Sequence, residues 1–317
     1  MLRNKIAVLR GGTDNLHDIS LKSGGYVLKA LDQKYHVDDI VLDREGNWFK
    51  NGNRVVAKEA FSEALMVFNA LHGECSKIQR FLESFDIRYT GSGALANGLS
   101  LNKTQSKKLF SEHGIQTPYA KQLNNLPGMN PEVMAVEVFR SMPLPVILKP
   151  VNSGSSLGIH FAYDFDSLLT GIKELLIDND KLIIEEYIRG KEASVGVIES
   201  FRGHDTYPLM PVEIEKTGAV FSYESKYTGD IRKSCPGSFT EDEKSELSRV
   251  ASLAHEILDL KHYSNSDFIV HPTRGVFLLE TNALPALHEE SIYPSSLDSV
   301  GSNYSEFLDH LIELTGR

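Results

Sequence analysis

The sequence predicts an α/β protein with more than one domain, and three observations support this prediction. The chain has 317 residues, which is enough for two or three domains that each bury a hydrophobic core. Short apolar runs end at glycines and are followed by segments with helical spacing, an order typical of alternating strands and helices. Hydrophobic residues make up 41% of the chain and charged residues 24%, a composition typical of globular proteins.

The charge and the cysteine content exclude several classes of protein. The formal net charge of -10 argues against non-specific nucleic-acid binding, which needs many lysines and arginines at the phosphates. The chain has no run of about 18 apolar residues, as a membrane span requires, and the apolar run near its start is too short for a signal peptide. The two cysteines, Cys75 and Cys235, do not make a disulfide framework. We therefore expect a cytoplasmic protein that binds neither nucleic acid nor membrane.

The first hundred residues predict an α/β unit. Residues 5–9 form an apolar run that stops at the glycine pair 11–12, which is typical of a buried parallel strand. We expect Ser20 to cap the helix that follows, because serine is a preferred N-cap residue. A second apolar run, residues 64–71, precedes an amphipathic helix over 78–85.

The rest of the chain predicts two units that are richer in hairpins. In the middle, we expect a helix over 102–112, capped by Asn102, strands at 146–149, 159–163 and 182–184, and a helix over 165–176. In the last third, we expect strands at 193–198, 207–214, 267–270 and 276–280, and a helix over 247–258. Residues 216–240 show little periodicity, and an irregular segment of this length inside a compact domain is usually functional.

A loop rich in glycine and serine, residues 153–158, is the first candidate site. Glycines let backbone N–H groups approach phosphate oxygens, and serine hydroxyls add further donors. The loop is not a Walker A motif, because no glycine-lysine-serine or glycine-lysine-threonine follows it. The alternative is a flexible hairpin turn without a ligand.

Asp267, Glu280 and Asn282 form the second candidate site. Asp267 and Glu280 start and end a predicted hairpin, so their side chains can lie side by side on adjacent strands. Asn282 is two residues beyond Glu280 and therefore points to the same face. Carboxylate and amide oxygens are ligands that Mg²⁺ prefers, while a solvated polar face is the alternative explanation.

Two lysines form the third candidate site. Lys149 lies in an apolar strand, where an ammonium group needs a partner such as a nucleotide phosphate, and the glutamates Glu185 and Glu186 follow a later apolar strand. Lys103 lies in a predicted helix, where a plain surface lysine is a strong alternative.

Eight short motifs, taken in order, resemble the D-alanine–D-alanine ligase family of ATP-grasp enzymes over essentially the whole chain. They are Gly11-Gly12-Thr13, Ser20-Leu21-x-Ser23-Gly24, Leu71-His72-Gly73, Tyr89-Thr90-Gly91-Ser92-Gly93, Lys149-Pro150, Gly154-Ser155-Ser156-x-Gly158, Lys226-Tyr227 and Leu279-Glu280-x-Asn282. The resemblance implies an α/β, three-domain ATP-grasp fold: an N-terminal α/β domain (1–102), a central domain with the phosphate loop (103–186) and a C-terminal domain (187–317) with a mobile lid at 216–240. It also implies that ATP phosphorylates a carboxylate and that an amine attacks the acyl phosphate.

The resemblance further implies a role for each site residue. Two Mg²⁺ ions, or Mn²⁺ in their place, would be held by Asp267, Glu280 and Asn282. ATP would be bound by Lys103, Lys149, Lys226, Ser155 and Ser156 at the phosphates, by Glu185 and Ile188 at the adenine, and by Glu192 at the ribose. The catalytic set would be Ser155, Tyr227 and Asn265, and His72 and Ser291 would lie near the substrate carboxylates.

The amino-acid side of the predicted site departs from the family pattern. Leu16 stands where the family has a glutamate that holds the ammonium group of the first substrate, and Asn265 stands where it has an arginine that stabilises charge at the reacting centre. About three residues are missing after Gly73, and Ala286 and His288 replace a glycine and a small polar residue.

Three functions therefore remain open at the level of the sequence. The simplest is D-alanine–D-alanine ligation for the peptidoglycan precursor. The second is a ligase of this family with a different acid or amine, and the third is a nucleotide-binding homologue without ligase activity. The partners expected are small amino-acid substrates, with a homodimer among the oligomeric states to consider.

Overall fold

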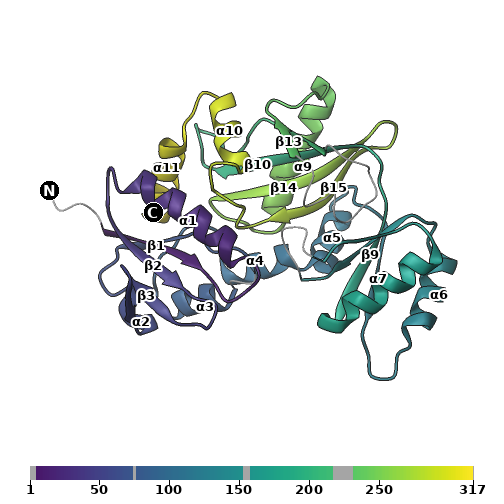
Figure 1. Ribbon diagram of the computed structural model, residues 1–317. Coiled ribbons are helices and arrows are strands. Elements are labelled where there is room, and N and C mark those ends of the chain that lie inside the picture. The colour runs from purple at the N-terminus through teal and green to yellow at the C-terminus, as the bar shows by residue number, and fades with distance from the viewer. Residues whose placement is uncertain (1–4, 74–75, 153–157, 217–230, 317) are drawn as a thin grey trace.

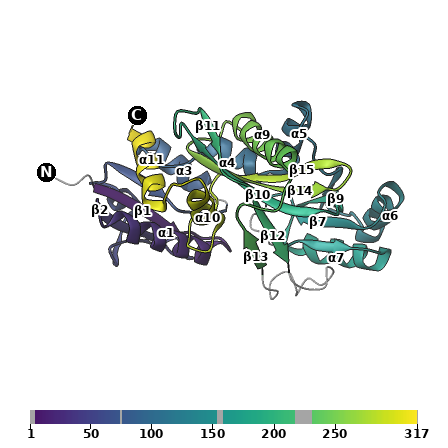
Figure 2. The same cartoon turned by 90° about the horizontal axis from the view of Figure 1, so that it is seen from above.

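Three β-sheets form the frame of the molecule. The computed structural model describes residues 5–73, 76–152, 158–216 and 231–316. The sheet from the start of the chain lies at one end of the molecule, and the sheet from the middle of the chain lies at the other (Figure 1). The third sheet lies between them, as the view from above also shows (Figure 2).

The N-terminal sheet follows the predicted alternation of strands and helices. Its region contains β1 (Lys5–Gly11), α1 (His17–Leu31), β2 (His36–Leu42), β3 (Trp48–Lys50), β4 (Asn53–Val55), α2 (Ala57–Ala60), β5 (Met66–Asn69) and α3 (Ser76–Ser84). β1 pairs in parallel with β2 and β5, and β2, β3 and β4 form an antiparallel meander. Residues 6–9 of β1 are fully buried, as expected for a strand inside a parallel sheet.

Two short helices lead from this sheet to the rest of the molecule. α4 (Ala94–Leu101) and α5 (Lys103–Glu112) meet at Asn102, whose side chain accepts a hydrogen bond from the backbone N–H of Gln105. This cap confirms the predicted start of α5. It also places Lys103 in the first turn, where that lysine is buried.

The middle of the chain forms a four-stranded antiparallel sheet with two helices. Its elements are β6 (Ala120–Asn124), α6 (Pro131–Ser141), β7 (Val146–Pro150), β8 (His160–Ala162), α7 (Phe165–Asp178) and β9 (Lys181–Glu186). β7 pairs with β8 as the hairpin that the sequence predicts, and the strand order is β6-β9-β7-β8. The side chains of Leu148, Leu182 and Ile184 pack with α6 and α7, so the other face, with Lys149, Ile183 and Glu185, is turned away from these helices.

The third sheet is antiparallel and carries the predicted 267–280 hairpin. Its region contains β10 (Lys191–Glu199), β11 (Thr206–Pro208), β12 (Val212–Lys216), β13 (Ile231–Ser234), α9 (Glu241–Ile257), β14 (Tyr263–His271), β15 (Gly275–Asn282), α10 (Ile292–Ser299) and α11 (Tyr304–Gly316). The strand order is β13-β12-β10-β14-β15, and β11 pairs with β10. α9 packs on one face of this sheet.

The last helix returns to the start of the chain. Phe307, Leu308 and Leu311 of α11 are fully buried in the same hydrophobic core as β1 and β5. Figure 1 shows α11 and α10, in yellow, beside α1. None of the helices in the described ranges is long and apolar enough to cross a membrane.

Three predicted elements were wrong in detail. α1 begins at His17, so Ser20 is not its cap: the Ser20 hydroxyl accepts a hydrogen bond from Gly11 N–H (2.9 Å) and donates to Ala70 C=O (2.8 Å). The predicted strand over 207–214 is split into β11 and β12, because Pro208 and Pro211 cannot donate to a strand ladder. Part of the irregular segment is the strand β13, while residues 217–230 lie outside the described part of the chain.

Candidate active site

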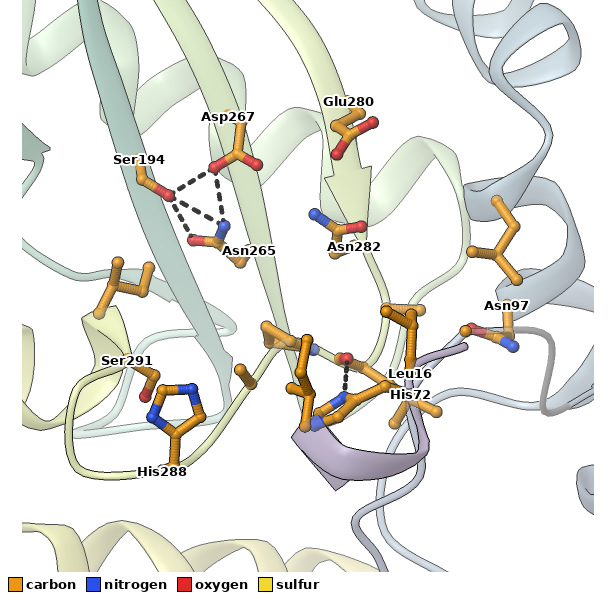
Figure 3. Close-up of a pocket in the computed structure, with 18 of the residues that line it drawn as sticks. Leu16, His72, Asn97, Ser194, Asn265, Asp267, Glu280, Asn282, His288 and Ser291 are labelled. Atoms are coloured by element: carbon orange, nitrogen blue, oxygen red, sulfur yellow. Dashed lines mark hydrogen bonds between the residues drawn. The ribbon is translucent and has the colours of Figure 1, made fainter. Parts of the chain in front are cut away.

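A cavity of about 260 Å³ lies where the third sheet meets α1 and α4. The residues that line it come from the start of α1, the segment after β5, α4, five strands of the third sheet and the segment that leads into α10 (Figure 3). Its polar residues include Asn97, Ser194, Lys233, Asn265, Asp267, Glu280, Asn282, His288 and Ser291. Six of the residues predicted for the site therefore line one cavity: His72, Asn265, Asp267, Glu280, Asn282 and Ser291.

The predicted metal residues are aligned by an irregularity in the hairpin. Asp267 lies opposite Glu280, and Asn265 lies opposite Asn282, so all four side chains share one face. The register shifts by one residue between Asp267 and Phe268. In a regular ladder, Leu279 and not Glu280 would face Asp267. The extra residue therefore brings the two carboxylates together.

The two carboxylates repel each other, and lysines offset the charge of one of them. Burial and the Glu280 carboxylate raise the pKa of Asp267 to about 6. Burial would also raise the pKa of Glu280, but Lys103 and Lys149 outweigh it and lower that pKa. The Lys103 ammonium lies 3.2 Å from the Glu280 carboxylate, which rules out the interpretation of Lys103 as a plain surface residue.

The donor set of this site fits a hard cation. Two adjacent carboxylates and the Asn282 amide oxygen are the ligands that Mg²⁺ prefers, and a cation between the carboxylates would remove their repulsion. Within the described residues, no group of three or more histidines, cysteines, aspartates or glutamates is arranged to hold a metal. An ion at this site would therefore need water or phosphate oxygens to complete its coordination, as Mg²⁺ usually does.

Asn265 is tied to its neighbours and does not project freely into the cavity. Its amide nitrogen donates to Ser194 Oγ (2.9 Å) and to Asp267 Oδ1 (3.0 Å), and Ser194 Oγ donates to the same oxygen of Asp267 (2.6 Å). Figure 3 shows this triangle of hydrogen bonds between β10 and β14.

A buried charge cluster lies beside the metal residues. Glu185 is 2% exposed and lies between two ammonium groups, those of Lys149 at 2.8 Å and Lys107 at 3.0 Å. Burial would raise the pKa of Glu185, but these two lysines hold it at about 2. Lys107 was missed by our sequence analysis. The available signal was its spacing of four residues from Lys103, which places both on one face of α5.

The predicted adenine residue Ile188 lies in the connection between β9 and β10, and the predicted ribose residue Glu192 lies in β10. Ile188 is buried in a small apolar cluster with Ile269 and Phe277, and Leu279 packs against this cluster. Glu192 of β10 lies opposite Ile269 of β14. The contacts of Glu185 and Ile188 with adenine and of Glu192 with ribose stay predictions.

The far end of the cavity is partly apolar. Leu16, Ile19 and Leu284 line it, and among its lining residues that the structure describes, only Asp267 and Glu280 are acidic. Ser291 is the N-cap residue of α10, and its buried hydroxyl has no hydrogen-bond partner among the described residues. The same holds for Nδ1 of His288, which lies next to Ser291 in Figure 3.

His72 lines the cavity, but both of its ring nitrogens have protein partners. Nδ1 lies 2.9 Å from the Leu284 carbonyl, and Nε2 lies 2.9 Å from Ser23 Oγ. Burial lowers the pKa of His72 to about 4, so the imidazole is neutral at pH 7. A direct contact between His72 and a substrate carboxylate stays a prediction.

The low pKa of His72 should make stability fall in weak acid. The unfolded chain takes up a proton at His72 near pH 6.5, whereas the folded chain does so only near pH 4. The contribution of neutral His72 to the free energy of unfolding is fully present above pH 6.5 and decreases as the pH falls. The loss reaches about 3 kcal/mol by pH 4. Urea unfolding from pH 7.5 to 4 should show a shallower pH dependence in His72→Gln than in the wild type. Parallel curves would contradict a buried, neutral His72.

Four predicted site residues lie outside the described residues. Ser155 and Ser156 of the phosphate loop fall in 153–157, and Lys226 and Tyr227 fall in 217–230. Their predicted contacts with ATP, and the catalytic roles of Ser155 and Tyr227, remain predictions.

The order of the sheets and the paired carboxylates beside buried lysines are those of an ATP-grasp enzyme, and solved structures agree. D-alanyl-alanine synthetase A from Vibrio cholerae superposes with a TM-score of 0.89 at 25% identity and covers 100% of both chains. The VanG D-Ala:D-Ser ligase from Enterococcus faecalis has a TM-score of 0.86 at 25% identity and covers 99% of both chains.

Sequence comparisons identify the family. Residues 109–313 match the family model described as D-ala D-ala ligase C-terminus. The D-alanine–D-alanine ligase of Macrococcus caseolyticus is 31% identical over 344 aligned positions, which cover 99% of this chain and 96% of that protein. The chain belongs to the D-alanine–D-alanine ligase family, whose members are ATP-dependent ligases that form a C–N bond.

Proposed function

We propose that the protein activates the carboxylate of one amino acid with ATP and joins it to the amine of a second, with D-alanine in both positions. The product would be the D-alanyl-D-alanine unit of the peptidoglycan precursor. The observation that supports this proposal best is the Asp267–Glu280 pair, with Lys103 at 3.2 Å from Glu280. Such a pair of carboxylates can hold Mg²⁺ against nucleotide phosphates.

Each group of residues has a part in this reaction. When bound, two Mg²⁺ ions, or Mn²⁺ in their place, would neutralise the charge of the phosphates during phosphoryl transfer. Lys103 and Lys149 would stabilise the transferring phosphoryl group, as positioned cations do. Ile188 would contact the adenine and Glu192 the ribose. Ser291, whose buried hydroxyl has no described partner, would bind a substrate carboxylate.

A second candidate is the same reaction with a different acid. Leu16 and Ile19 line the far end of the cavity, and Leu16 cannot hold an ammonium group. A first substrate without a free α-ammonium group, such as a 2-hydroxy acid, would fit this apolar wall better. We further propose that the protein acts in the cytoplasm, and a homodimer is the first oligomeric state to test.

Nucleotide binding should raise thermal stability in the presence of Mg²⁺. ADP at 100 times its dissociation constant should stabilise the fold by about 2.7 kcal/mol, because it binds only the folded state. The thermal shift should be measured with and without Mg²⁺. An unchanged melting curve at millimolar ADP and Mg²⁺ would contradict ATP-grasp activity.

Product analysis should then separate the candidate substrates. The protein, ATP and Mg²⁺ should be incubated with D-alanine alone, with L-alanine as a control, and with D-alanine plus D-lactate. The proposal expects D-alanyl-D-alanine by mass spectrometry in the first reaction. A product only in the third would favour the second candidate, and nucleotide binding without any product would indicate a homologue without ligase activity.

A further inference from the structure

Asp267 is held on one side by two neighbouring side chains. Its Oδ1 accepts hydrogen bonds from Ser194 Oγ (2.6 Å) and from Asn265 Nδ2 (3.0 Å). No described residue donates to its second oxygen, Oδ2. Ser194 is 1% exposed and Asn265 is 7% exposed, so the hydrogen bonds to Oδ1 are largely shielded from water.

The amide of Asn265 is oriented by Ser194 and Asp267. Its nitrogen lies 2.9 Å from Ser194 Oγ and 3.0 Å from Asp267 Oδ1, and these two oxygens are 2.6 Å apart, so both acceptors lie on the same side of the amide nitrogen. The opposite orientation of the amide would place its oxygen against the Asp267 carboxylate, which is repulsive. The network therefore fixes the orientation of the Asn265 amide.

We propose that Asn265 and Ser194 are positioning residues, which fix one oxygen of Asp267 so that the other is oriented toward a bound divalent cation. The proposal rests on the proposed function in that it takes Asp267 as a cation ligand. It differs from the role that the sequence predicts for Asn265, which is a direct part in catalysis. In this arrangement Asn265 acts through Asp267 and does not contact the reacting atoms.

The physical advantage is an ordered ligand. An aspartate side chain can rotate, and a carboxylate next to Glu280 would turn away from it to reduce repulsion. Two hydrogen bonds to Oδ1 resist that rotation and share the charge on this oxygen. Hydrogen bonds from groups behind a metal ligand usually raise metal affinity by 10- to 100-fold, on the order of what we expect here.

The test is the affinity for Mn²⁺ in the presence of ADP, measured by the electron paramagnetic resonance of free Mn²⁺. Asn265→Leu and Ser194→Ala should each weaken Mn²⁺ binding by about tenfold, while the affinity for ADP without metal stays within about twofold. Ser194→Thr keeps the hydroxyl and should restore binding to within about threefold of the wild type. Ser266→Ala is the matched control, because it removes a buried hydroxyl bonded to Thr281 on the opposite face of β14.

Two outcomes would overturn the proposal. One is unchanged Mn²⁺ affinity in Asn265→Leu with a lower kcat, which would mean that Asn265 acts on the substrate directly. The other is an equal loss in Ser266→Ala, which would mean that any change in β14 weakens the site. If Asn265→Leu does not fold, as judged by circular dichroism, Asn265→Ala and Ser194→Ala carry the same test.

This experiment is independent of the ligation assay. Weaker Mn²⁺ binding in the variants of a protein that joins no amino acids would support the positioning role and contradict the proposed function. Ligation by the wild type, together with unchanged Mn²⁺ affinity in the variants, would support the proposed function and contradict the positioning role.

Discussion

Glu280→Gln should lower the turnover of the enzyme by at least about 10²-fold, because it removes charge stabilisation at the phosphoryl group. A neutral amide cannot bind two cations as a carboxylate can. Lys103 would also lose its partner at 3.2 Å, and its ammonium would repel a cation at Asp267. The Mg²⁺ dependence of the steady-state rate should shift to higher concentrations, while circular dichroism shows an intact fold.

A surface glutamate provides the matched control for this change. Glu246 of α9 accepts two hydrogen bonds from Arg249 at 2.8 and 2.7 Å and does not line the cavity. Glu246→Gln removes the same charge and should leave both kcat and the Mg²⁺ dependence unchanged. If Glu280→Gln behaves like Glu246→Gln, Glu280 is a structural strand residue and holds no metal.

Glu185→Gln should cause the largest loss of stability, about 3–5 kcal/mol, because it removes the nearest counter-charge of two buried ammonium groups. Lys107 and Lys149 lie 3.0 and 2.8 Å from the Glu185 carboxylate. Lys149→Met should cost less, since Lys107 and Glu185 would still form a balanced pair. Urea unfolding at pH 7 measures both changes.

The double variant separates charge balance from packing. Glu185→Gln with Lys149→Met leaves one buried ammonium where the single variant leaves two, so it should recover part of the lost stability. Equal losses in Glu185→Gln and Lys149→Met would contradict this account. They would mean that each hydrogen bond, and not the count of buried charges, sets the stability.

Local chemistry made several features predictable from the sequence. Asn102 caps α5 as expected, because an asparagine side chain replaces a missing backbone partner without help from the rest of the fold. The hairpin of β14 and β15 was also predicted correctly, since two apolar runs flank the short turn Thr273-Arg274-Gly275. The family pattern found Asp267, Glu280 and Asn282, and the structure places all three in one cavity.

Features that depend on tertiary contacts could not be predicted in this way. The extra residue at Leu279 aligns Glu280 with Asp267, and no local pattern marks such a register shift. Ser20 was predicted as a cap because serine favours that position, but its hydroxyl bridges Gly11 and Ala70 instead. The role of Asn265 depends on Ser194, which is 71 residues away in the chain.

Because the last helix, α11, packs into the core of the first sheet, the elements beside one end of the cavity share a single hydrophobic core. Leu16 immediately precedes α1, and Ser291 immediately precedes α10. The core that includes Val27, Leu297 and Phe307 joins these two helices to β1. The spacing between the start of α1 and the start of α10 is therefore set by packing within this one core. The sheet of β6, β7, β8 and β9, which carries Lys149 and Glu185, has a separate hydrophobic core. A movement of that sheet would therefore shift Lys149 and Glu185 without changing how α1 and α10 are placed relative to each other.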